Sequence, residues 1–248
     1  MLLENKVAVI YGAGGAIGSA VAQVFAREGA KVFLAGRTKA KLDKIADEIR
    51  SNGGSVETAV VDAVNEQAVD QFVDQVVKQA GQIDISFNLI GDDDVQRPLP
   101  EISVEDFLQP IMNAMRAQFL TTRAAARHMV RNGSGVILHF GGGGPQTQPG
   151  LGGFKIALDA IEGLRRQWAV ELGPHGIRVL TLKTGGIPET IPDLKEREYI
   201  VANLLPATLL NRAATLADVG NVAAFVASDQ ARTITSTEVN ISCGAIVD

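Results

Sequence analysis

Apolar and polar residues follow two alternating patterns along this chain. Short apolar runs, rich in β-branched residues, are separated by longer segments in which apolar positions recur with the 3.6-residue period of a helix. This alternation is typical of a parallel sheet covered by helices on both faces. We therefore predict a single doubly wound α/β domain over residues 1–248.

The individual elements follow from the same two periods. Seven strands are predicted over Lys6–Tyr11, Lys31–Ala35, Ser55–Val61, Ile83–Asn88, Gly135–Phe140, Ile177–Leu182 and Glu238–Ile241. Helices are predicted over Ile17–Glu28, Ala40–Ser51, Glu66–Ala80, Val104–Arg131, Gly153–Leu172 and Leu216–Ser228. Ser103 with Asp106, and Thr215 with Asp218, fit capping boxes at two of the helix starts.

One long segment, residues 183–211, shows no clear period and is rich in Pro and Leu. In a domain of this kind such a segment is usually a substrate-covering lid or a mobile loop. Its apolar side chains indicate an apolar small-molecule substrate, although they could equally pack the segment onto the domain: Ile187, Ile191, Leu194, Leu204 and Leu205.

Composition narrows the class of protein. With 46% hydrophobic and 21% charged residues, the chain resembles ordinary soluble domains, and a net charge of −5 gives no reason to expect nucleic acid as a partner. Cys243 is the only cysteine, so an intrachain disulfide is impossible and no metal site is expected. Glycines interrupt the most membrane-like stretch, Val7–Ala26, and no basic leader precedes it. We expect a cytoplasmic protein without a membrane partner.

A glycine-rich turn joins the first predicted strand to the first predicted helix. Residues 12–18 read GAGGAIG and include Gly12, Gly15, Ile17 and Gly18. Glycines allow a tight turn and let the backbone approach a pyrophosphate, while the helix N-terminus supplies N–H donors and the positive end of its dipole. This context predicts a Rossmann-like dinucleotide-binding fold.

The end of the second predicted strand bears on the choice of cofactor. An NAD site needs a carboxylate near this point to hold the adenosine ribose hydroxyls, but the chain has Gly36 there. The adjacent Arg37 can form charge-assisted hydrogen bonds with a 2′-phosphate. NADP(H) is therefore favoured over NAD(H), unless Arg37 is simply a solvated surface residue.

Several motifs in order make the chain resemble the short-chain dehydrogenase/reductase family over essentially its full length. Gly12 and Gly18 match the first and third glycines of the family fingerprint, while Ala16 replaces the middle one and Tyr11 replaces a small hydroxyl residue. Further matches are Asp62 after the third strand, Asn88 to Gly91 after the fourth, Asn113 on the long helix, Arg178 and Val179 in the sixth strand, and Thr184, Gly185, Gly186 and Ile187 beside the expected nicotinamide.

The turn, the Arg37 argument and the resemblance together give an expected cofactor-binding set. Its members are Gly12, Gly15, Ile17, Gly18, Arg37, Asp62, Ala63, Asn88, Gly91, Lys155, Gly185 and Ile187. In the family the helix that corresponds to Gly153–Leu172 and the preceding long helix form a dimer interface, so the resemblance also implies a homo-oligomer, a dimer or a tetramer.

The catalytic positions depart from the family pattern. The family's tyrosine, which exchanges a proton with the substrate oxygen, corresponds to Leu151, and its serine, which holds that oxygen, corresponds to Gly141 or Gly142. Of the catalytic set, Asn113 and Lys155 remain, the latter as an expected ribose ligand. Loss of a general acid costs about 10²–10⁴ in rate, so hydride transfer is handicapped rather than forbidden.

No other residue clearly supplies the missing proton. His139 is expected to be packed or hydrogen-bonded, because strand alternation turns it away from the face that carries Leu138 and Phe140. The remaining candidates are an acidic triplet at the carboxyl edge of the sheet, a tyrosine in the expected lid, and two histidines that we expect at the surface: Asp92, Asp93 and Asp94; Tyr199; His128 and His175.

Three functions are compatible with these residues. The first is an atypical NADP(H)-dependent oxidoreductase that acts on a carbonyl or alcohol with a degenerate catalytic set. The second is a catalytically silent NADP(H)-binding protein, either a sensor or an inactive partner subunit, as the changes at Leu151 and Gly142 would allow. The third, a lyase or cyclase that uses the cofactor as a structural element, has the least support. Substrate and reaction direction are not indicated.

Overall fold

A seven-stranded parallel sheet forms the centre of the molecule. The computed structural model describes residues 1–90, 94–142 and 147–247, and within them the strand order is β3-β2-β1-β4-β5-β6-β7. The strands are β1 (Val7–Tyr11), β2 (Lys31–Gly36), β3 (Ser55–Val60), β4 (Ile85–Asn88), β5 (Gly135–Gly141), β6 (Ile177–Lys183) and β7 (Thr237–Asn240). This order confirms the prediction of a doubly wound, Rossmann-like sheet.

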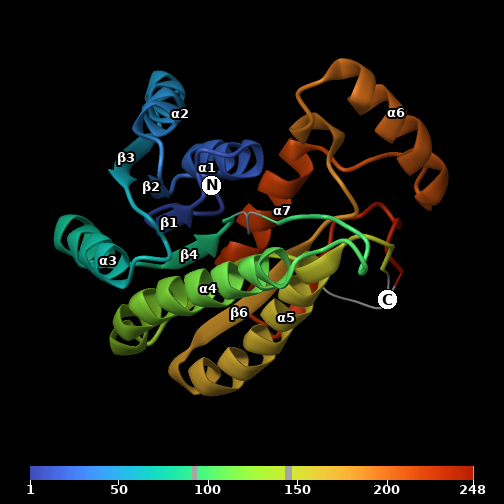
Figure 1. The fold of residues 1–248 in the computed structure, drawn as a ribbon. Helices are drawn as coiled ribbons and strands as arrows, with labels where there is room; N and C mark the ends of the chain where they lie inside the picture. The colour runs from blue at the N-terminus through green and yellow to red at the C-terminus, as the bar shows by residue number, and fades with distance from the viewer. Residues whose placement is uncertain (91–93, 143–146, 248) are drawn as a thin grey trace.

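Helices cover both faces of this sheet (Figure 1). One layer contains α1, α2 and α7, and the other contains α3, α4 and α5, while α6 stands apart from both layers. Their bounds are α1 (Ala16–Arg27), α2 (Lys39–Ser51), α3 (Glu66–Ala80), α4 (Val104–Asn132), α5 (Gly152–Leu172), α6 (Leu194–Leu204) and α7 (Leu216–Ala227).

Strand alternation divides the apolar residues between two cores. Ala8 and Ile10 of β1 face the core under α1, α2 and α7, whereas Val9 and Tyr11 face the core under α3, α4 and α5. Both faces are thus buried, which explains the nearly continuous apolar sequence of these strands. The predicted strands and helices were correct to within about two residues at each end.

Residues 183–211 differ from the predicted loop. Their first residue, Lys183, completes β6, and the segment then contains the α6 helix as well as two short 3₁₀ helices, Pro188–Thr190 and Leu205–Ala207. The apolar period was not visible because none of the α6 residues is buried. A capping signal was present, however, since the Asp193 carboxylate accepts a hydrogen bond of 2.8 Å from the Glu196 N–H.

The predicted helix caps are present. Thr215 and Asp218 form the full capping box at the start of α7, and the Ser103 hydroxyl accepts a 3.0 Å hydrogen bond from the Asp106 N–H at the start of α4. Each bond satisfies a backbone N–H that has no partner within its own helix.

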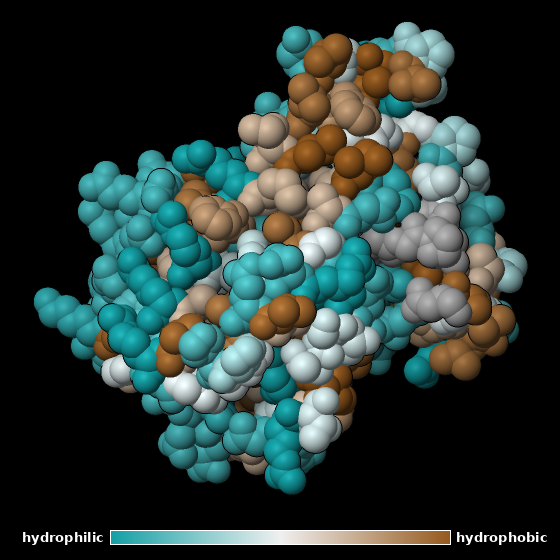
Figure 2. Space-filling model, turned by 90° about the horizontal axis from the view of Figure 1, so that it is seen from below, coloured by the Kyte–Doolittle hydropathy of each residue, from teal (hydrophilic) through white to brown (hydrophobic). Residues whose placement is uncertain are grey.

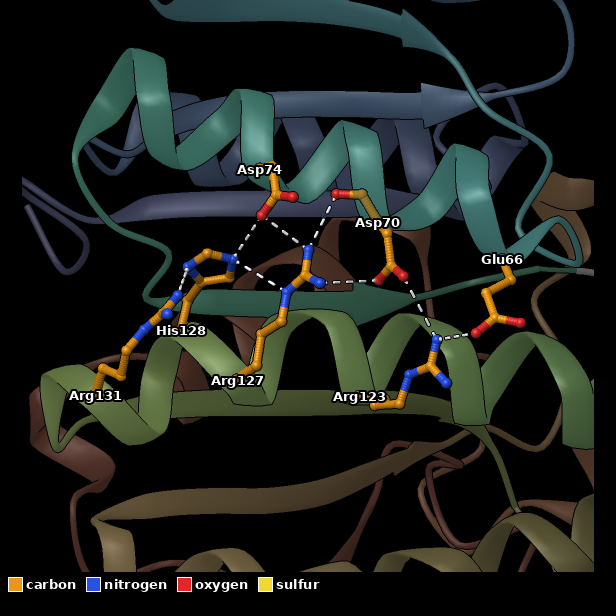
Figure 3. A network of polar contacts seen from close by, with 7 residues as sticks. All are labelled: Glu66, Asp70, Asp74, Arg123, Arg127, His128 and Arg131. Carbon is orange, nitrogen blue, oxygen red and sulfur yellow. Dashed lines mark hydrogen bonds and ion pairs between the residues drawn. The ribbon is translucent and has the colours of Figure 1, made fainter.

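Charged side chains join α3 to α4 along their outer edge (Figure 3). Arg127 of α4 lies 2.8 Å from Asp74 of α3, and Arg123 lies 2.7 Å from Glu66. His128 was predicted to lie at the surface, and this was wrong: it is only 8% exposed because it sits on the face of α4 that packs against α3, with its Nε2 3.1 Å from Asp74. Burial, with help from neighbouring arginines, lowers the pKa of His128.

The surface is uneven in polarity. On the face in Figure 2, hydrophilic side chains cover one side, whereas apolar side chains gather toward the top and right. Several large apolar side chains of α4 and α6 are exposed, including Val104, Met112, Phe119, Leu194 and Tyr199. Among the helices that the structure describes, none combines the length and the apolar character needed to cross a membrane.

Candidate active site

A pocket of about 340 Å³ opens at the carboxyl ends of β1, β2 and β3. This is the edge at which doubly wound parallel sheets bind ligands. Gly12, Arg37, Asp62, Ala63 and Asn113, all predicted site residues, meet around it. The rest of its lining is Tyr11, Ala35, Gly36, Val61, Val64, Ile90 and Gln109.

Close packing explains two of the glycines in the turn after β1. A Cβ on Gly12 would lie 2.3 Å from the Leu89 carbonyl oxygen, and the backbone there has a φ of +73°. A Cβ on Gly18 would lie 2.5 Å from the Gly12 carbonyl oxygen and 2.8 Å from the Cα of Ala13. The absence of side chains therefore keeps α1 close to β1, with the helix N-terminus directed toward a ligand at the turn.

The start of α1 itself leaves room for a ligand. Gly15 is the N-cap, without a side-chain cap, and Ile17 lies in the first turn of the helix. Ala16, which stands where the family has a glycine, is exposed, so its methyl group does not disturb the packing behind the turn. An uncapped helix N-terminus with exposed small residues can donate N–H groups to a phosphate.

Basic side chains gather next to this turn. Arg37 follows β2 directly, is exposed and lines the pocket. Lys41 of α2 packs against the turn, since a Cβ on Gly14 would lie 3.4 Å from the Lys41 Cβ, and Lys44 shares a shallow hollow with Gly14 and Gly15. Sequence reasoning missed both lysines because they belong to a helix that approaches the turn only in the folded chain.

Asp62 and Asn88 hold the backbone at their own strand ends. The Asp62 carboxylate accepts a 3.2 Å hydrogen bond from the Val64 N–H. The buried Asn88 amide donates to the Thr121 hydroxyl at 2.9 Å and accepts from the Ile90 N–H at 3.1 Å. Asn88 therefore fixes the turn after β4 to α4. Gly91, predicted as a cofactor ligand, lies outside the described residues.

Asn113 and Lys155 approach the site from α4 and α5. The Asn113 side chain lines the pocket and accepts a 2.9 Å hydrogen bond from Gln109. The Lys155 ammonium lies 2.5 Å from both carboxylate oxygens of Asp159, one turn further along α5. A ribose contact by Lys155 would therefore compete with this ion pair.

Gly142 and Leu151, predicted from the sequence to take the places of the family's serine and tyrosine, carry no hydroxyl. Gly142 follows β5, and Leu151 is the N-cap of α5 and is partly buried. A Cβ on Gly142 would lie 2.3 Å from Cγ of Lys183, and the φ of +138° also disfavours a side chain. A serine at position 142 would therefore require the Lys183 side chain to move or to be replaced.

Gly185 and Ile187 shape the turn after β6. A Cβ on Gly185 would lie 2.7 Å from the Cβ of Ala245, so this glycine allows the C-terminal segment to pack closely. Ile187 is buried in the core under α1 and α7. Both residues therefore hold this turn in place, and of the two Gly185 is the less buried.

The structure places most of the alternative proton donors. His139 is fully buried, as predicted, and its Nδ1 lies 2.6 Å from Oε1 of Gln118; burial, and then the charge of Arg165, lowers its pKa to about 3. Tyr199 and His175 are exposed, and Asp94 accepts a 2.8 Å hydrogen bond from Gln96. Asp92 and Asp93 lie outside the described residues.

A buried charged cluster beneath the end of β6 was missed. Lys183, 1% exposed, forms a 2.7 Å ion pair with Glu238 of β7, and Arg165 of α5 forms a 2.7 Å ion pair with Glu162. Burial raises the pKa of Glu162, and the adjacent Glu238 raises it further, whereas Thr181 and Arg165 lower it. The alternation of Ile177, Val179, Thr181 and Lys183 on one face of β6 was the available signal.

The arrangement fits a dinucleotide. The two glycines at which a Cβ would strike the backbone open the turn to a pyrophosphate, and the pocket extends from that turn to Asp62 and to Asn113. Within residues 1–90, 94–142 and 147–247, there is no group of three or more His, Cys, Asp and Glu side chains that could hold a metal ion.

Comparisons with known proteins agree with this geometry. The family model described as enoyl-(acyl carrier protein) reductase matches residues 12–245. The uncharacterized oxidoreductase YxbG of Bacillus subtilis is 33% identical over 250 residues, which cover 98% of this chain and 91% of that protein. The 3-oxoacyl-[acyl-carrier-protein] reductase FabG of Thermotoga maritima is 28% identical over 254 residues and the full length of both chains.

Solved structures share the fold. A short-chain type dehydrogenase/reductase from Mycobacterium ulcerans superposes with a TM-score of 0.91 at 24% identity, over 99% of this chain and 91% of that one. A short-chain dehydrogenase/reductase from Serratia marcescens does so with a TM-score of 0.88 at 25% identity, over 99% of both chains. The chain belongs to the short-chain dehydrogenase/reductase family, a family of oxidoreductases whose members bind NAD(P)(H).

Proposed function

We propose that this protein is an atypical NADP(H)-dependent oxidoreductase that acts on a carbonyl or alcohol group. The observation that carries the proposal is the pocket in which Gly36 replaces a carboxylate and Arg37 lines the wall. A Cβ on Gly36 would make an ordinary contact of 3.4 Å with a methyl group of Leu42, so the absence of a carboxylate here is a choice of residue and not a consequence of crowding. Lys41 and Lys44 add positive charge beside the same turn.

Calorimetric titration with NADPH and with NADH tests the cofactor part. We expect tight NADPH binding and weaker NADH binding. In Arg37→Gln, NADPH affinity should fall about 10- to 100-fold, the worth of one charge-assisted hydrogen bond, while NADH affinity stays unchanged. Arg232→Gln, which removes an exposed arginine that does not line the pocket, serves as the control. Failure of the wild type to bind either cofactor would overturn the proposal.

The catalytic part is tested by hydride transfer. We expect slow oxidation of NADPH with apolar carbonyl compounds, and a 3-oxoacyl thioester belongs in the panel because the Thermotoga maritima relative is a 3-oxoacyl-[acyl-carrier-protein] reductase. The exposed apolar side chains of α6, Leu194 and Tyr199, support an apolar substrate covered by residues 183–211. Normal NADPH binding without any turnover would contradict an enzymatic role.

A catalytically silent NADP(H)-binding protein is the second candidate. It is favoured by the apolar Leu151 at the tyrosine position and by Gly142, where Lys183 leaves no space for a side chain. Leu151→Tyr distinguishes the two. A gain of turnover would show a competent site that lacks only an acid, whereas no gain with intact NADPH binding would favour the silent protein.

The assembly and location of the protein complete the proposal. Exposed Val104, Leu108, Met112 and Phe119 on α4 support a homo-oligomer through the α4 and α5 faces. The cytoplasm is the location that we propose for it. Light scattering should give a dimer or tetramer, and Met112→Glu should shift the mass toward the monomer. A monomeric wild type at micromolar concentration would refute this assembly.

A further inference from the structure

A lysine occupies the space of the missing side chain at residue 142. The Cγ, Cδ and Cβ atoms of Lys183 lie 2.3, 2.6 and 2.9 Å from the point where a Gly142 Cβ would be. Gly142 follows β5 and Lys183 ends β6, at the edge where the sheet binds ligands. In the proposed function this is the place of the hydroxyl that would hold the substrate oxygen.

The ammonium group of Lys183 is bound in an ion pair and is shielded from solvent. Its ammonium pairs with the Glu238 carboxylate at 2.7 Å, and Glu238 is a β7 residue whose side chain is 21% exposed. Lys183 itself is almost fully buried. The Glu238 carboxylate beside it offers a path by which a donated proton could be returned.

A second carboxyl group extends this path. Glu162 of α5 lies beside Glu238 and Thr181, and it pairs with Arg165 at 2.7 Å. Burial and the neighbouring Glu238 raise the pKa of Glu162, which favours a proton on the Glu162 carboxyl group. The two cations then outweigh the single carboxylate, which favours an anion at this end of the sheet.

We infer that Lys183 is the proton donor to the substrate oxygen, with Glu238 and Glu162 returning the proton to it. The inference rests on the proposed oxidoreductase function. The carbonyl carbon gains a hydride, with both electrons, from a reduced nicotinamide cofactor, and the C=O π bond opens onto oxygen. An N–H bond of Lys183 breaks as the new O–H bond forms. The neutral amine takes the proton shared by Glu162 and Glu238, and Glu238 takes a replacement from solvent.

Lys183→Met tests the step, because methionine keeps the stem and removes the charge. We expect kcat/KM for carbonyl reduction to fall about 10²–10⁴-fold while NADPH affinity stays unchanged. The decline of kcat/KM at high pH, which reports the donor's deprotonation, should disappear. The charged groups around the donor are Glu238 on β7, Glu162 and Arg165 on α5, and, further off, the neutral His139 on β5.

Lys6→Met is the matched control. Lys6 is also paired with a carboxylate, Asp229 at 3.1 Å, but it lies just before β1, at the amino ends of the strands. This variant should keep the wild-type rate and pH profile.

If Lys183→Met does not fold, Glu238→Gln provides a second test of the step. It keeps the shape of the side chain, and it should lower the rate and move the high-pH limb by weakening the proton return. NMR of protein labelled with ¹³C-lysine adds a readout without turnover, since the Lys183 titration should move in Glu238→Gln. An unmoved titration and pH profile would overturn the inference.

Two results distinguish a failure of the Lys183 step from a failure of the proposed oxidoreductase activity. Turnover by Lys183→Met at the wild-type rate with the wild-type pH profile would overturn the role of Lys183 alone. NADPH binding by the wild type without hydride transfer to any carbonyl tested would overturn the proposed activity and this step together.

Discussion

Backbone and small residues build the site at the ends of β1, β2 and β3, whereas buried charged side chains build it at the ends of β5 and β6. We call these the cofactor half and the catalytic half. The cofactor half contains the close-packed glycines and the pocket-lining Arg37, while the catalytic half has no hydroxyl at Gly142 or Leu151 and contains a buried lysine. Their residues are Gly12, Gly18, Gly36, Arg37 and Asp62 in the first half, and Gly142, Leu151, Lys155, Lys183 and Glu238 in the second.

The difference between the two halves shows which features of a site tolerate substitution and which do not. A phosphate-binding turn depends on glycines whose replacement would move the backbone, so few substitutions preserve it. A proton donor needs only an ionisable atom within reach of the substrate, and different elements can supply it. In the proposed function, the chain keeps its cofactor site and uses a different proton donor.

The largest effect is expected from Gly18→Ala. Its Cβ would lie 2.5 Å from the Gly12 carbonyl oxygen, so either α1 or the turn must move. We expect a loss of about 1–3 kcal/mol in unfolding free energy, the usual cost of overpacking, together with a loss of NADPH binding. Urea unfolding and calorimetric titration measure the two effects.

Gly163→Ala is the matched control for this substitution. Nothing lies within 4 Å of a Cβ at Gly163, which is in the interior of α5. Alanine there should stabilise the protein by about 0.5–1 kcal/mol, because glycine is a poor helix former. Equal effects of the two substitutions would show that the turn tolerates a Cβ and would weaken the contrast between the halves.

Gly142→Ser tests the catalytic half in the same way. Its Cβ would overlap the Lys183 stem, so we expect a destabilisation of about 1–3 kcal/mol. In Lys183→Ala the overlapping Cγ and Cδ atoms are gone, and the serine should cost less. A double-mutant cycle by urea unfolding should therefore show a coupling of about 0.5–3 kcal/mol. Additive effects would mean that the two positions do not compete for space.

Sequence reasoning succeeded where local pattern and backbone rules decide the structure. Strand and helix periods predicted the sheet and most of its helices, and the glycine spacing predicted the turn that lines the pocket. It failed where contacts depend on distant elements. Lys41 approaches the turn from α2, and His128 is buried against α3. Lys183 pairs with Glu238, and Glu238 meets Glu162 of α5, only after the sheet and α5 have packed together.

The buried histidine of β5 should make stability depend on pH. His139 has a pKa of about 3 in the folded chain, against 6.5 for an ordinary histidine, so between these values the unfolded chain binds a proton that the folded chain does not. Its contribution is complete above about pH 6.5 and is lost as the pH falls toward 3. The unfolding free energy should decline by up to about 1.4 kcal/mol per pH unit in this window.

Urea unfolding at neutral and mildly acidic pH measures this slope. His139→Gln retains an amide that can bond Gln118 and removes the titrating ring, so its slope should be shallower than that of the wild type. His175→Gln, at an exposed position in the turn before β6, should leave the slope unchanged. Equal slopes in the wild type and His139→Gln would show that other groups determine the acid sensitivity.

The smallest effect is expected from Asp74→Asn. It measures how much an exposed ion pair contributes to the free energy of unfolding, for comparison with the buried Lys183–Glu238 pair of the catalytic half. The Asp74 side chain is 60% exposed and lies 2.8 Å from Arg127 (Figure 3), so solvent and salt screen the attraction. Its loss should cost about 0.2–1 kcal/mol in urea unfolding, and the difference should shrink in high salt. Glu238→Gln leaves the buried ammonium of Lys183 without its carboxylate, and it should cost more at every salt concentration. A larger cost for Asp74→Asn would mean that the buried pair contributes little, and that Lys183 is retained for its proton chemistry rather than for stability.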